Sequence, residues 1–402
     1  MRIFVLNSGS SSIRYSIFDM QNESRLLSGK IELNGKPDSI NFDTVQKIPG
    51  EIDKQVDSPA VTDHASGLLQ IFELLQDYEP DSANFFHAIG HRVVHGGESF
   101  HMPALIDETV IAAIRNTIPL APLHNPVNLT GIEEMHRRFP NTVQVAVFDT
   151  TFFRTLPPRA YRYAVPNELY REHHVRRYGF HGISHQHVAG EVASHLKQPL
   201  KSLRIISVHL GNGASAAAIQ DGICIDTSMG MTPTEGLVMG TRCGDLDPSL
   251  HFYLTRSLGM SIDEIESMLN HDSGLKGLCG SHDMREVQRM SNEGDGQARL
   301  AIDIYCYRAC KYIGAYFTVL GGLDVLAFTG GIGENDAVIR KSICDKLSAT
   351  GISLDQERNL SQPAGTFSIN EDDCKIKVLV VPANEELEIA RQTFSLLNKT
   401  SG

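Results

Sequence analysis

Two stretches, RIFVLNSGSSSIRYSIFD (Arg2–Asp19) and RIISVHLGNGASAAAIQD (Arg204–Asp221), decide the fold of this chain. They align without a gap, at an offset of 202 residues that places Gly9 on Gly211. In each stretch an apolar run leads into a polar, glycine-containing turn and a second run follows, which is typical of a β-hairpin. Because the offset is about half of the 402 residues, we expect two related halves. Two unrelated hairpins with a common pattern would align equally well, so that alternative stays open.

Beyond each hairpin, strand-like segments alternate with segments of helical periodicity, which predicts an α/β fold. The predicted strands cover residues 88–94, 142–148, 204–210, 325–329 and 376–381. The predicted helices cover residues 66–77, 109–116, 128–139, 184–195, 262–269, 296–319, 337–349 and 385–397. We expect a first domain over residues 1–150 and a second over 151–385. The terminal helix, residues 386–402, is expected to return to the first domain, because the ends of a domain often lie close together.

Composition excludes several classes of protein. The hydrophobic content of 41% supports a large core, and a net charge of −12 without a basic patch argues against a nucleic-acid partner. The N-terminal apolar run is too short for a signal peptide and no later stretch reads as a membrane span, so we expect a cytoplasmic protein. Seven cysteines without a Cys-x-x-Cys pair indicate neither a disulfide framework nor a zinc site.

Three glycine-containing loops follow predicted strands, over residues 7–12, 209–215 and 328–335. Backbone amides and small hydroxyls in such loops can converge on phosphate oxygens, and three loops together favour a nucleotide. None fits the P-loop pattern, and no Gly-x-Gly-x-x-Gly opens a helix, so those two nucleotide-binding motifs are excluded.

Charged residues stand at the ends of other predicted elements. Arg92, in GHRVVHGGE, and Arg242, in TRCGDLDP, could share the charge of a transferring phosphoryl group. Asp149 and Glu385 follow apolar strands and suit Mg²⁺, although a helix N-cap would explain either equally well. His181 follows Tyr178-Gly179-Phe180 and could stabilise an oxyanion, but it is one of 17 histidines and could be a bystander.

Taken together, these strings resemble the acetate kinase family, and more broadly the short-chain acyl kinases, over essentially the whole chain. The matching strings, in family order, are LNSGSSSIRYSIFD, GHRVVHGGE, APLHNP, VFDTTFF, RRYGFHGISH, HLGNGAS, DTSMGMTPTEGLVMGTRCGDLDP, FTGGIGEN and NEELEIA. The resemblance implies the duplicated fold of actin, Hsp70 and sugar kinases (ribonuclease H-like), with ATP in a cleft between two α/β domains. It also implies a homodimer that interconverts ATP and acetate with ADP and acetyl phosphate by direct in-line transfer, using Mg²⁺ or, as a substitute, Mn²⁺.

The same resemblance assigns roles to individual residues. Arg92 would hold the acyl carboxylate or the phosphate, Arg242 and His181 would stabilise the phosphoryl group, and Asp149 would orient substrate and magnesium waters. Asn7 and Glu385 would support Mg²⁺. The implied nucleotide-binding residues are Ser10, Ser12, Arg14, His209, Leu210, Gly211, Asn212, Gly213, Asp283, Met284, Arg285, Gly331, Ile332, Gly333, Glu334 and Asn335.

The family's apolar acyl pocket maps onto Val94, Leu123, Phe180 and Pro233. Because one methylene in such a pocket changes selectivity by only about 10–200-fold, these residues leave acetate and propionate open, with Val94 favouring acetate.

Three residues depart from the family pattern: Arg14 replaces a lysine, Phe153 a histidine and Cys243 a serine. None removes a residue assigned to transfer, so we expect activity to survive.

Three alternatives remain. The first is a propionate or butyrate kinase, distinguished by acyl chain length. The second is a non-catalytic, nucleotide-dependent switch, which would not need Arg92, Asp149, His181 and Arg242. The third is a sugar kinase, which would need an aspartate base and a polar pocket in place of the apolar one.

Overall fold

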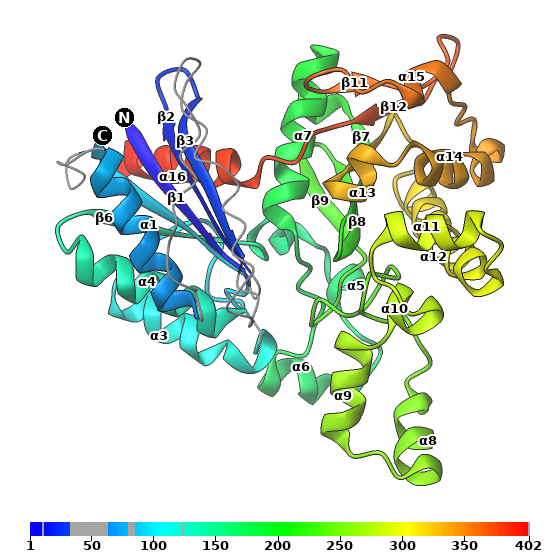
Figure 1. Ribbon diagram of the computed structural model, residues 1–402, viewed down its shortest axis with the longest axis horizontal. Coiled ribbons are helices and arrows are strands. Elements are labelled where there is room, and N and C mark those ends of the chain that lie inside the picture. Colours follow the sequence, from blue (N-terminus) through cyan, green and yellow to red (C-terminus); the bar gives the residue numbers. More distant parts are fainter. Residues whose placement is uncertain (10–11, 33–62, 79–84, 123, 401–402) are drawn as a thin grey trace. The chain divides into compact units, whose positions relative to one another are not determined.

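The computed structural model describes residues 1–9, 12–32, 63–78, 85–122 and 124–400 (Figure 1). The chain divides into two compact units. Unit 1 comprises Met1–Thr151 and Asn384–Gly402, and unit 2 comprises Phe152–Ala383. Within the described ranges, no helix has the length and apolarity needed to cross a membrane.

Unit 1 is built on a mixed sheet. Its strands are β1 (Arg2–Ser8), β2 (Ser12–Asp19), β3 (Ser24–Glu32), β4 (Ala88–Val93), β5 (Ala104–Leu105) and β6 (Val143–Phe148). Among the described residues the sheet has six strands in the order β3-β2-β1-β4-β6-β5. Strands β1, β4 and β6 are parallel, whereas β2, β3 and β5 pair antiparallel with their neighbours.

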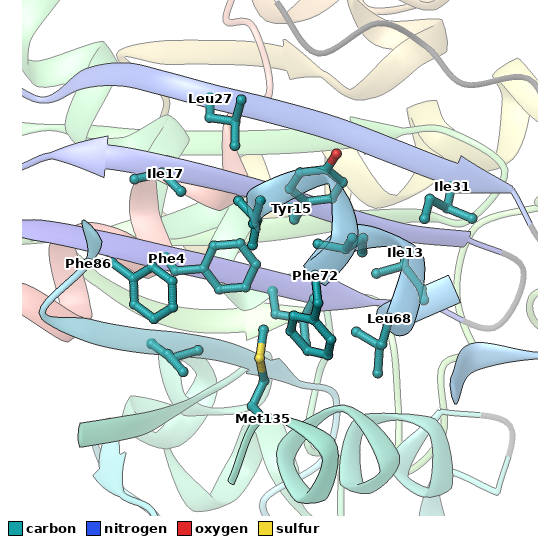
Figure 2. Close-up of a cluster of buried hydrophobic side chains, with 14 residues drawn as sticks. Phe4, Ile13, Tyr15, Ile17, Leu27, Ile31, Leu68, Phe72, Phe86 and Met135 are labelled. Carbon is teal, nitrogen blue, oxygen red and sulfur yellow. The ribbon is translucent and has the colours of Figure 1, made fainter. Parts of the chain in front are cut away.

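Helices cover both faces of the unit 1 sheet. They are α1 (His64–Tyr78), α3 (Glu108–Asn116), η1 (Ile118–Leu120), α4 (Asn125–Arg138) and α16 (Glu385–Thr400). Figure 2 shows Phe72 of α1 and Met135 of α4 against Phe4 and Ile13 of the sheet, in one buried apolar cluster. Side chains alternate between the faces of a strand, so Gly90, next to Ile89 of this cluster, faces the other way. There it meets α16, where Thr393 leaves no room for a side chain on Gly90.

Unit 2 repeats the sheet of unit 1. Its strands are β7 (Arg204–Leu210), β8 (Ala214–Gln220), β9 (Ile223–Thr227), β10 (Val325–Thr329), β11 (Phe367–Ser368) and β12 (Lys377–Val380). The order β9-β8-β7-β10-β12-β11 matches that of unit 1 strand for strand, with the same parallel and antiparallel pairs. The prediction of two similar α/β halves is therefore confirmed.

The helices of unit 2 are more numerous. The 3-10 helix η2 (Thr151–Thr155) stands where the chain leaves unit 1. The others are α5 (Pro158–Tyr161), α6 (Asn167–His173), α7 (Gly182–Leu196), η3 (Leu200–Ser202), α8 (Ser249–Leu258), α9 (Ile262–His271), α10 (Gly274–Cys279), α11 (Met284–Asn292), α12 (Gly296–Val319), α13 (Gly330–Asn335), α14 (Ala337–Lys346), η4 (Ser348–Thr350) and α15 (Gln356–Leu360).

The two hairpins differ by one residue at the turn. Ser8 pairs with Ile13 in the first hairpin, whereas Leu210 pairs with Ala214 in the second, whose turn is one residue shorter. The gapless alignment therefore holds for the first strand of each hairpin and is one residue out in the second strand. With that correction, the register irregularities at Ile17/Phe18 and at Ala218/Ile219 fall at equivalent places, a further likeness between the halves.

Candidate functional site

In unit 1, the half-buried Arg92 is the centre of a polar group. Its Nη2 lies 2.6 Å from Asp149 Oδ2, and its Nε lies 3.2 Å from each carboxylate oxygen of Asp149. Its Nη1 donates to Asn7 Oδ1 at 3.2 Å and lies 4.0 Å from Glu385 Oε2. The structure thus brings together four of the predicted site residues of unit 1.

The sheet explains why these four residues meet. Asn7 lies near the end of β1, Arg92 near the end of β4, and Asp149 directly after β6, and these three strands are parallel neighbours. The Asp149 N–H donates to Val93 O at 2.9 Å, which extends the ladder by one bond and fixes the start of the loop. Glu385 is the first residue of α16. Carboxyl ends of parallel strands are the usual place for a ligand site in α/β sheets.

Burial and charge act against each other in this group. Burial lowers the pKa of Arg92, but Asp149 and Glu385 outweigh it, so the pKa of the guanidinium lies above its ordinary value. Burial also raises the pKa of the Asp149 carboxyl, a shift that Arg92 opposes and Glu385 adds to. Since the guanidinium donates three hydrogen bonds to it, we describe Asp149 as a carboxylate held by a permanent cation. Two acids facing one arginine leave excess negative charge, which a bound cation would offset.

The other predicted residues of unit 1 are placed less closely. Arg14 is exposed on β2 and pairs with Asn7 across the hairpin, so the two side chains share one face of the sheet. Ser12 is half-buried at the start of β2, and Val94 is buried, with its N–H on Asn128 Oδ1 at 3.0 Å. Ser10 and Leu123 lie outside the described residues.

In unit 2, the predicted nucleotide loops gather at the carboxyl ends of the parallel strands β7 and β10. Gly330 has φ +79°, and a Cβ there would lie 2.7 Å from Leu210 O, so only glycine lets this loop approach β7 so closely. A Cβ on Gly240 would lie 2.2 Å from Asn212 Oδ1 and 3.3 Å from His282 O. The segments His209–Gly213, Gly240–Arg242 and His282–Arg285 therefore meet.

The other residues predicted to bind the nucleotide belong to two helices, α11 with its cap and α13. Asp283 caps α11 by accepting from Arg285 N–H, and it pairs with the exposed Arg285 side chain. Met284 is buried. In α13, Glu334 accepts from Ala383 N–H at 2.9 Å; burial raises the pKa of Glu334, against this hydrogen bond and one from Gly330. Gly331, Ile332, Gly333 and Asn335 complete α13.

His181 and Arg242 converge on the same glycine of unit 2. The position of a Cβ on Gly213 would lie 3.3 Å from His181 Nε2 and 3.5 Å from Arg242 Nη1. Arg242 also donates to Pro233 O at 3.1 Å, while the buried Phe180 precedes His181 in the chain. His181 has φ +59°, a left-handed conformation that costs a non-glycine residue about 1–2 kcal/mol. Such strain often marks a functional position.

Magnesium fits this chain only as an ion with few protein ligands. Among the described residues, no three or more His, Cys, Asp or Glu side chains are placed to hold a metal. Asn7 and Glu385 offer hard oxygen atoms beside Arg92. Mg²⁺ prefers oxygen and usually keeps several waters while it binds one or two carboxylates and the substrate's phosphates. The donors present suit that mode.

A large cavity near this site was missed by the sequence reasoning. It encloses about 1090 Å³ in unit 2, between the loop that carries Pro233 and Arg242 and helices α8 and α9. Its wall includes Glu235, Cys243 and Asp245, but none of the predicted site residues. No local pattern announces it, because its walls come from segments far apart in the sequence.

Two of the residues that depart from the family pattern, Phe153 and Cys243, fit their surroundings by ordinary packing and hydrogen bonding. Phe153 is fully buried in an apolar cluster, edge-on to the His185 ring at 6.1 Å between centroids. Cys243 donates its thiol to Gly244 O at 3.1 Å, and burial raises the pKa of that thiol.

Comparison with known proteins agrees with the geometry. The model of the acetokinase family matches residues 2–391. An acetate kinase from Syntrophobacter fumaroxidans is 49% identical, covering 99% of this chain and 98% of its own. One from Streptomyces avermitilis is also 49% identical, covering 98% of this chain and 97% of its own.

Solved structures agree as well. An acetate kinase from Porphyromonas gingivalis superposes with a TM-score of 0.88 at 40% identity, covering 98% of this chain and 99% of its own. A propionate kinase from Francisella tularensis does so with the same TM-score and identity, covering 97% and 98%. The match spans nearly the whole length and includes every loop described above, so the chain belongs to the acetokinase family.

Proposed function

We propose that this chain is an acetate kinase, which transfers the γ-phosphoryl group of ATP to acetate and forms ADP and acetyl phosphate, reversibly. The observation that carries the proposal is the Arg92 group: a half-buried arginine held by Asp149 and Asn7, at the carboxyl ends of three parallel strands. The identity to curated acetate kinases supports it.

In this proposal, the unit 1 group binds the acceptor. The Arg92 guanidinium pairs with the carboxylate of acetate or with the phosphate, and Asp149 fixes the guanidinium in place. A carboxylate acceptor is already ionised at neutral pH, so no strong general base is needed. Asn7 and Glu385 would hold Mg²⁺ through oxygen and water, and the ion would supply charge neutralisation on the phosphates.

The unit 2 groups bind the donor. His209–Gly213, Asp283–Arg285 and Gly331–Asn335 hold the nucleotide, with Ser10, Ser12 and Arg14 of the first hairpin as further contacts. Arg242 and the Nε2 of His181 face one point and stabilise the charge on the equatorial oxygens of the phosphoryl group. Positioning and charge neutralisation supply most of the catalysis in such a direct transfer.

The acyl chain length that the enzyme prefers is a second question. We propose that Val94, Leu123, Phe180 and Pro233 form the acyl pocket and that Val94 favours acetate. Propionate is the rival substrate, since a propionate kinase is among the similar structures. We also propose a homodimer, a cytoplasmic location, residues 1–150 as the acyl domain and residues 151–385 as the nucleotide-binding domain.

Trapping with hydroxylamine tests the proposal. The protein is incubated with Mg-ATP and acetate, propionate, butyrate or glucose, because hydroxylamine captures acyl phosphates but not sugar phosphates. We expect hydroxamate with acetate above propionate and butyrate. Hydroxamate strongest with propionate would change the substrate, and glucose-dependent ADP formation without hydroxamate would replace the acyl kinase by a sugar kinase.

A further inference from the structure

Behind His181, unit 2 contains a line of alternating serines and histidines. Ser215 Oγ lies 2.9 Å from His181 Nδ1 and 2.8 Å from His185 Nε2. The other nitrogen of His185, Nδ1, lies 2.8 Å from Ser207 Oγ. Hydrogen bonds therefore join four side chains in the order Ser207, His185, Ser215, His181. This line of hydrogen bonds starts at Ser207 on β7, passes through His185 on α7 and Ser215 on β8, and ends at His181, which faces Gly213.

His185, in the middle of this chain, is a neutral imidazole. It is fully buried, and the Phe153 ring lies edge-on against it. Burial, with a smaller contribution from His209, lowers the pKa of His185 to about 3. A neutral imidazole has one N–H donor and one nitrogen lone pair, so it must donate to one serine and accept from the other.

The single hydroxyl hydrogen of the fully buried Ser215 must also be donated, either to His181 or to His185. Protons on both His181 Nδ1 and His185 Nε2 would leave that hydrogen without an acceptor among the described residues, so two directions remain for the whole line of hydrogen bonds. In the first, Ser207 donates to His185 Nδ1, His185 Nε2–H donates to Ser215, and Ser215 donates to His181 Nδ1. Each of the three hydrogens between Ser207 and His181 Nδ1 then has an acceptor. His181 then carries no proton on Nδ1, so its proton is on Nε2.

The second direction reverses every bond. His181 Nδ1–H donates to Ser215, Ser215 donates to His185 Nε2, and His185 Nδ1–H donates to Ser207. The hydroxyl hydrogen of Ser207 then needs another acceptor. Among the described residues, Ser207 Oγ has no hydrogen-bond partner besides His185. Because a fully buried hydroxyl without an acceptor is costly, the first direction is favoured.

We propose that Ser207, His185 and Ser215 are positioning residues that hold His181 as the neutral tautomer with its proton on Nε2. The inference rests on the proposed role of His181 at the phosphoryl group. It makes His181 a fixed hydrogen-bond donor toward the point that Arg242 Nη1 also faces, rather than a cation or a base.

The surroundings of His181 also disfavour an imidazolium. A proton on Nδ1 would either reverse the line of hydrogen bonds and leave the Ser207 hydrogen without an acceptor, or leave the Ser215 hydrogen without one, among the described residues. The ring of His209 is stacked on that of His181, with 4.4 Å between the centroids and 27° between the planes, and the Arg242 guanidinium lies on the Gly213 side. His185 stands behind Ser215. A positive charge on His181 would add to that of Arg242.

Nitrogen-15 NMR of the histidine side chains tests the tautomer directly. The full-length protein is labelled at histidine, and His181→Gln identifies the His181 signals by their loss. Near neutral pH we expect a protonated Nε2 and an unprotonated Nδ1 in the unmodified protein. A proton on Nδ1, alone or together with Nε2, would overturn the proposal. This result does not depend on any activity.

We call the hydrogen-bonded line of Ser207, His185, Ser215 and His181 the relay. A variant at its far end tests whether the relay sets the tautomer of His181. Ser207→Ala removes the hydroxyl that fixes the direction, two side chains away from His181, and should let His181 populate the form with a proton on Nδ1. We expect that signature together with a fall in kcat of about fivefold at unchanged KM for ATP and acetate. An unchanged His181 tautomer in Ser207→Ala would refute the relay.

Two further variants separate the relay from simple loss of packing. Ser215→Ala, which removes the hydrogen bond to His181 itself, should also change the tautomer and serves if Ser207→Ala does not fold. Thr227→Val is the matched control, since it removes a buried hydroxyl of the same sheet, bonded to Ala216 O at 3.0 Å, without touching a histidine. Its His181 signals should be unchanged. If the tautomer is as proposed but acetate is not phosphorylated, the proposed function fails and the relay does not.

Discussion

Arg92 reaches the Asp149 carboxylate with three hydrogen bonds, the shortest of them 2.6 Å between Nη2 and Oδ2, while a fourth bond ties it to Asn7. The guanidinium is thus oriented before any substrate arrives. Such preorganisation lowers the cost of binding a charged, planar acceptor.

The first prediction concerns the planar guanidinium of Arg92, which bonds Asp149 and Asn7 through separate nitrogens. Arg92→Lys keeps the positive charge but cannot bond Asp149 and Asn7 together, so we expect kcat/KM for acetate to fall by roughly 100-fold or more. Arg115→Lys is the control, because Arg115 pairs with Glu133 at the surface and should leave the kinetics unchanged. Steady-state kinetics decide, and an Arg92→Lys enzyme within tenfold of the original would contradict the assigned role.

The second prediction concerns Asp149. Asp149→Asn preserves the shape but removes the charge opposite Arg92, so activity should fall by about 100-fold or more. The free energy of unfolding should fall by less than about 3 kcal/mol, because the amide oxygen still accepts a hydrogen bond and Glu385 remains near the guanidinium. Urea unfolding and kinetics on the same samples measure both. Full activity in this variant would remove Asp149 from the site.

The sequence reveals some parts of this molecule and hides others. Apolar runs predict β7 and β10, and helical periodicity predicts α12, with their observed ends. Two predicted strand ends also indicate Arg92 and Asp149, whereas the role of Asn7 is implied only by the resemblance to the acetate kinase family. That the three residues meet follows from the parallel pairing of β1, β4 and β6, which the sequence does not predict. Short edge strands such as β5 and β11, with two residues each, carry too little pattern to be found.

Contacts across the fold are hidden for a different reason. Ser207, His185 and Ser215 are ordinary buried positions in the sequence, and only the packing of α7 on β7 and the register of β8 set their contacts. The shorter second turn likewise has no local signal, because the gapless alignment matches Gly9 with Gly211 and Ile17 with Ile219 equally well.

The third prediction concerns stability against pH. Burial lowers the pKa of His91 and of His95 to about 4, and that of His185 to about 3, from an ordinary value of 6.5. The unfolded chain therefore binds more protons below pH 6.5, so this stability is fully present above that pH and is lost as the pH falls toward the folded values. At a pH about one unit below 6.5, each histidine should lower the free energy of unfolding by about 1.4 kcal/mol, relative to a pH well above 6.5.

Urea midpoints measured at one pH well above 6.5 and at one about a unit below 6.5 test this effect. His91→Gln removes one of the three groups, so the difference between the midpoints should shrink by about a third. Equal midpoints for the original protein above and below the histidine range would show that these residues are not buried in neutral form.

The fourth prediction concerns Cys243, which by the resemblance given above takes the place of a serine. A serine hydroxyl can also donate to Gly244 O, so Cys243→Ser should retain activity within about twofold. Because burial raises the pKa of the Cys243 thiol, alkylating reagents should modify it slowly at neutral pH. Mass spectrometry after timed alkylation measures the rate, and fast modification that abolishes activity would show the thiol to be open to solvent.

The central claim is that the carboxylate of acetate accepts the phosphoryl group of ATP. Phosphorus-31 NMR of a reaction with Mg-ATP and acetate labelled with oxygen-18 in both carboxylate positions tests it directly. We predict acetyl phosphate whose phosphorus signal is shifted by one bridging oxygen-18 from acetate. Release of unlabelled inorganic phosphate alone, with no acetyl phosphate signal, would contradict the claim.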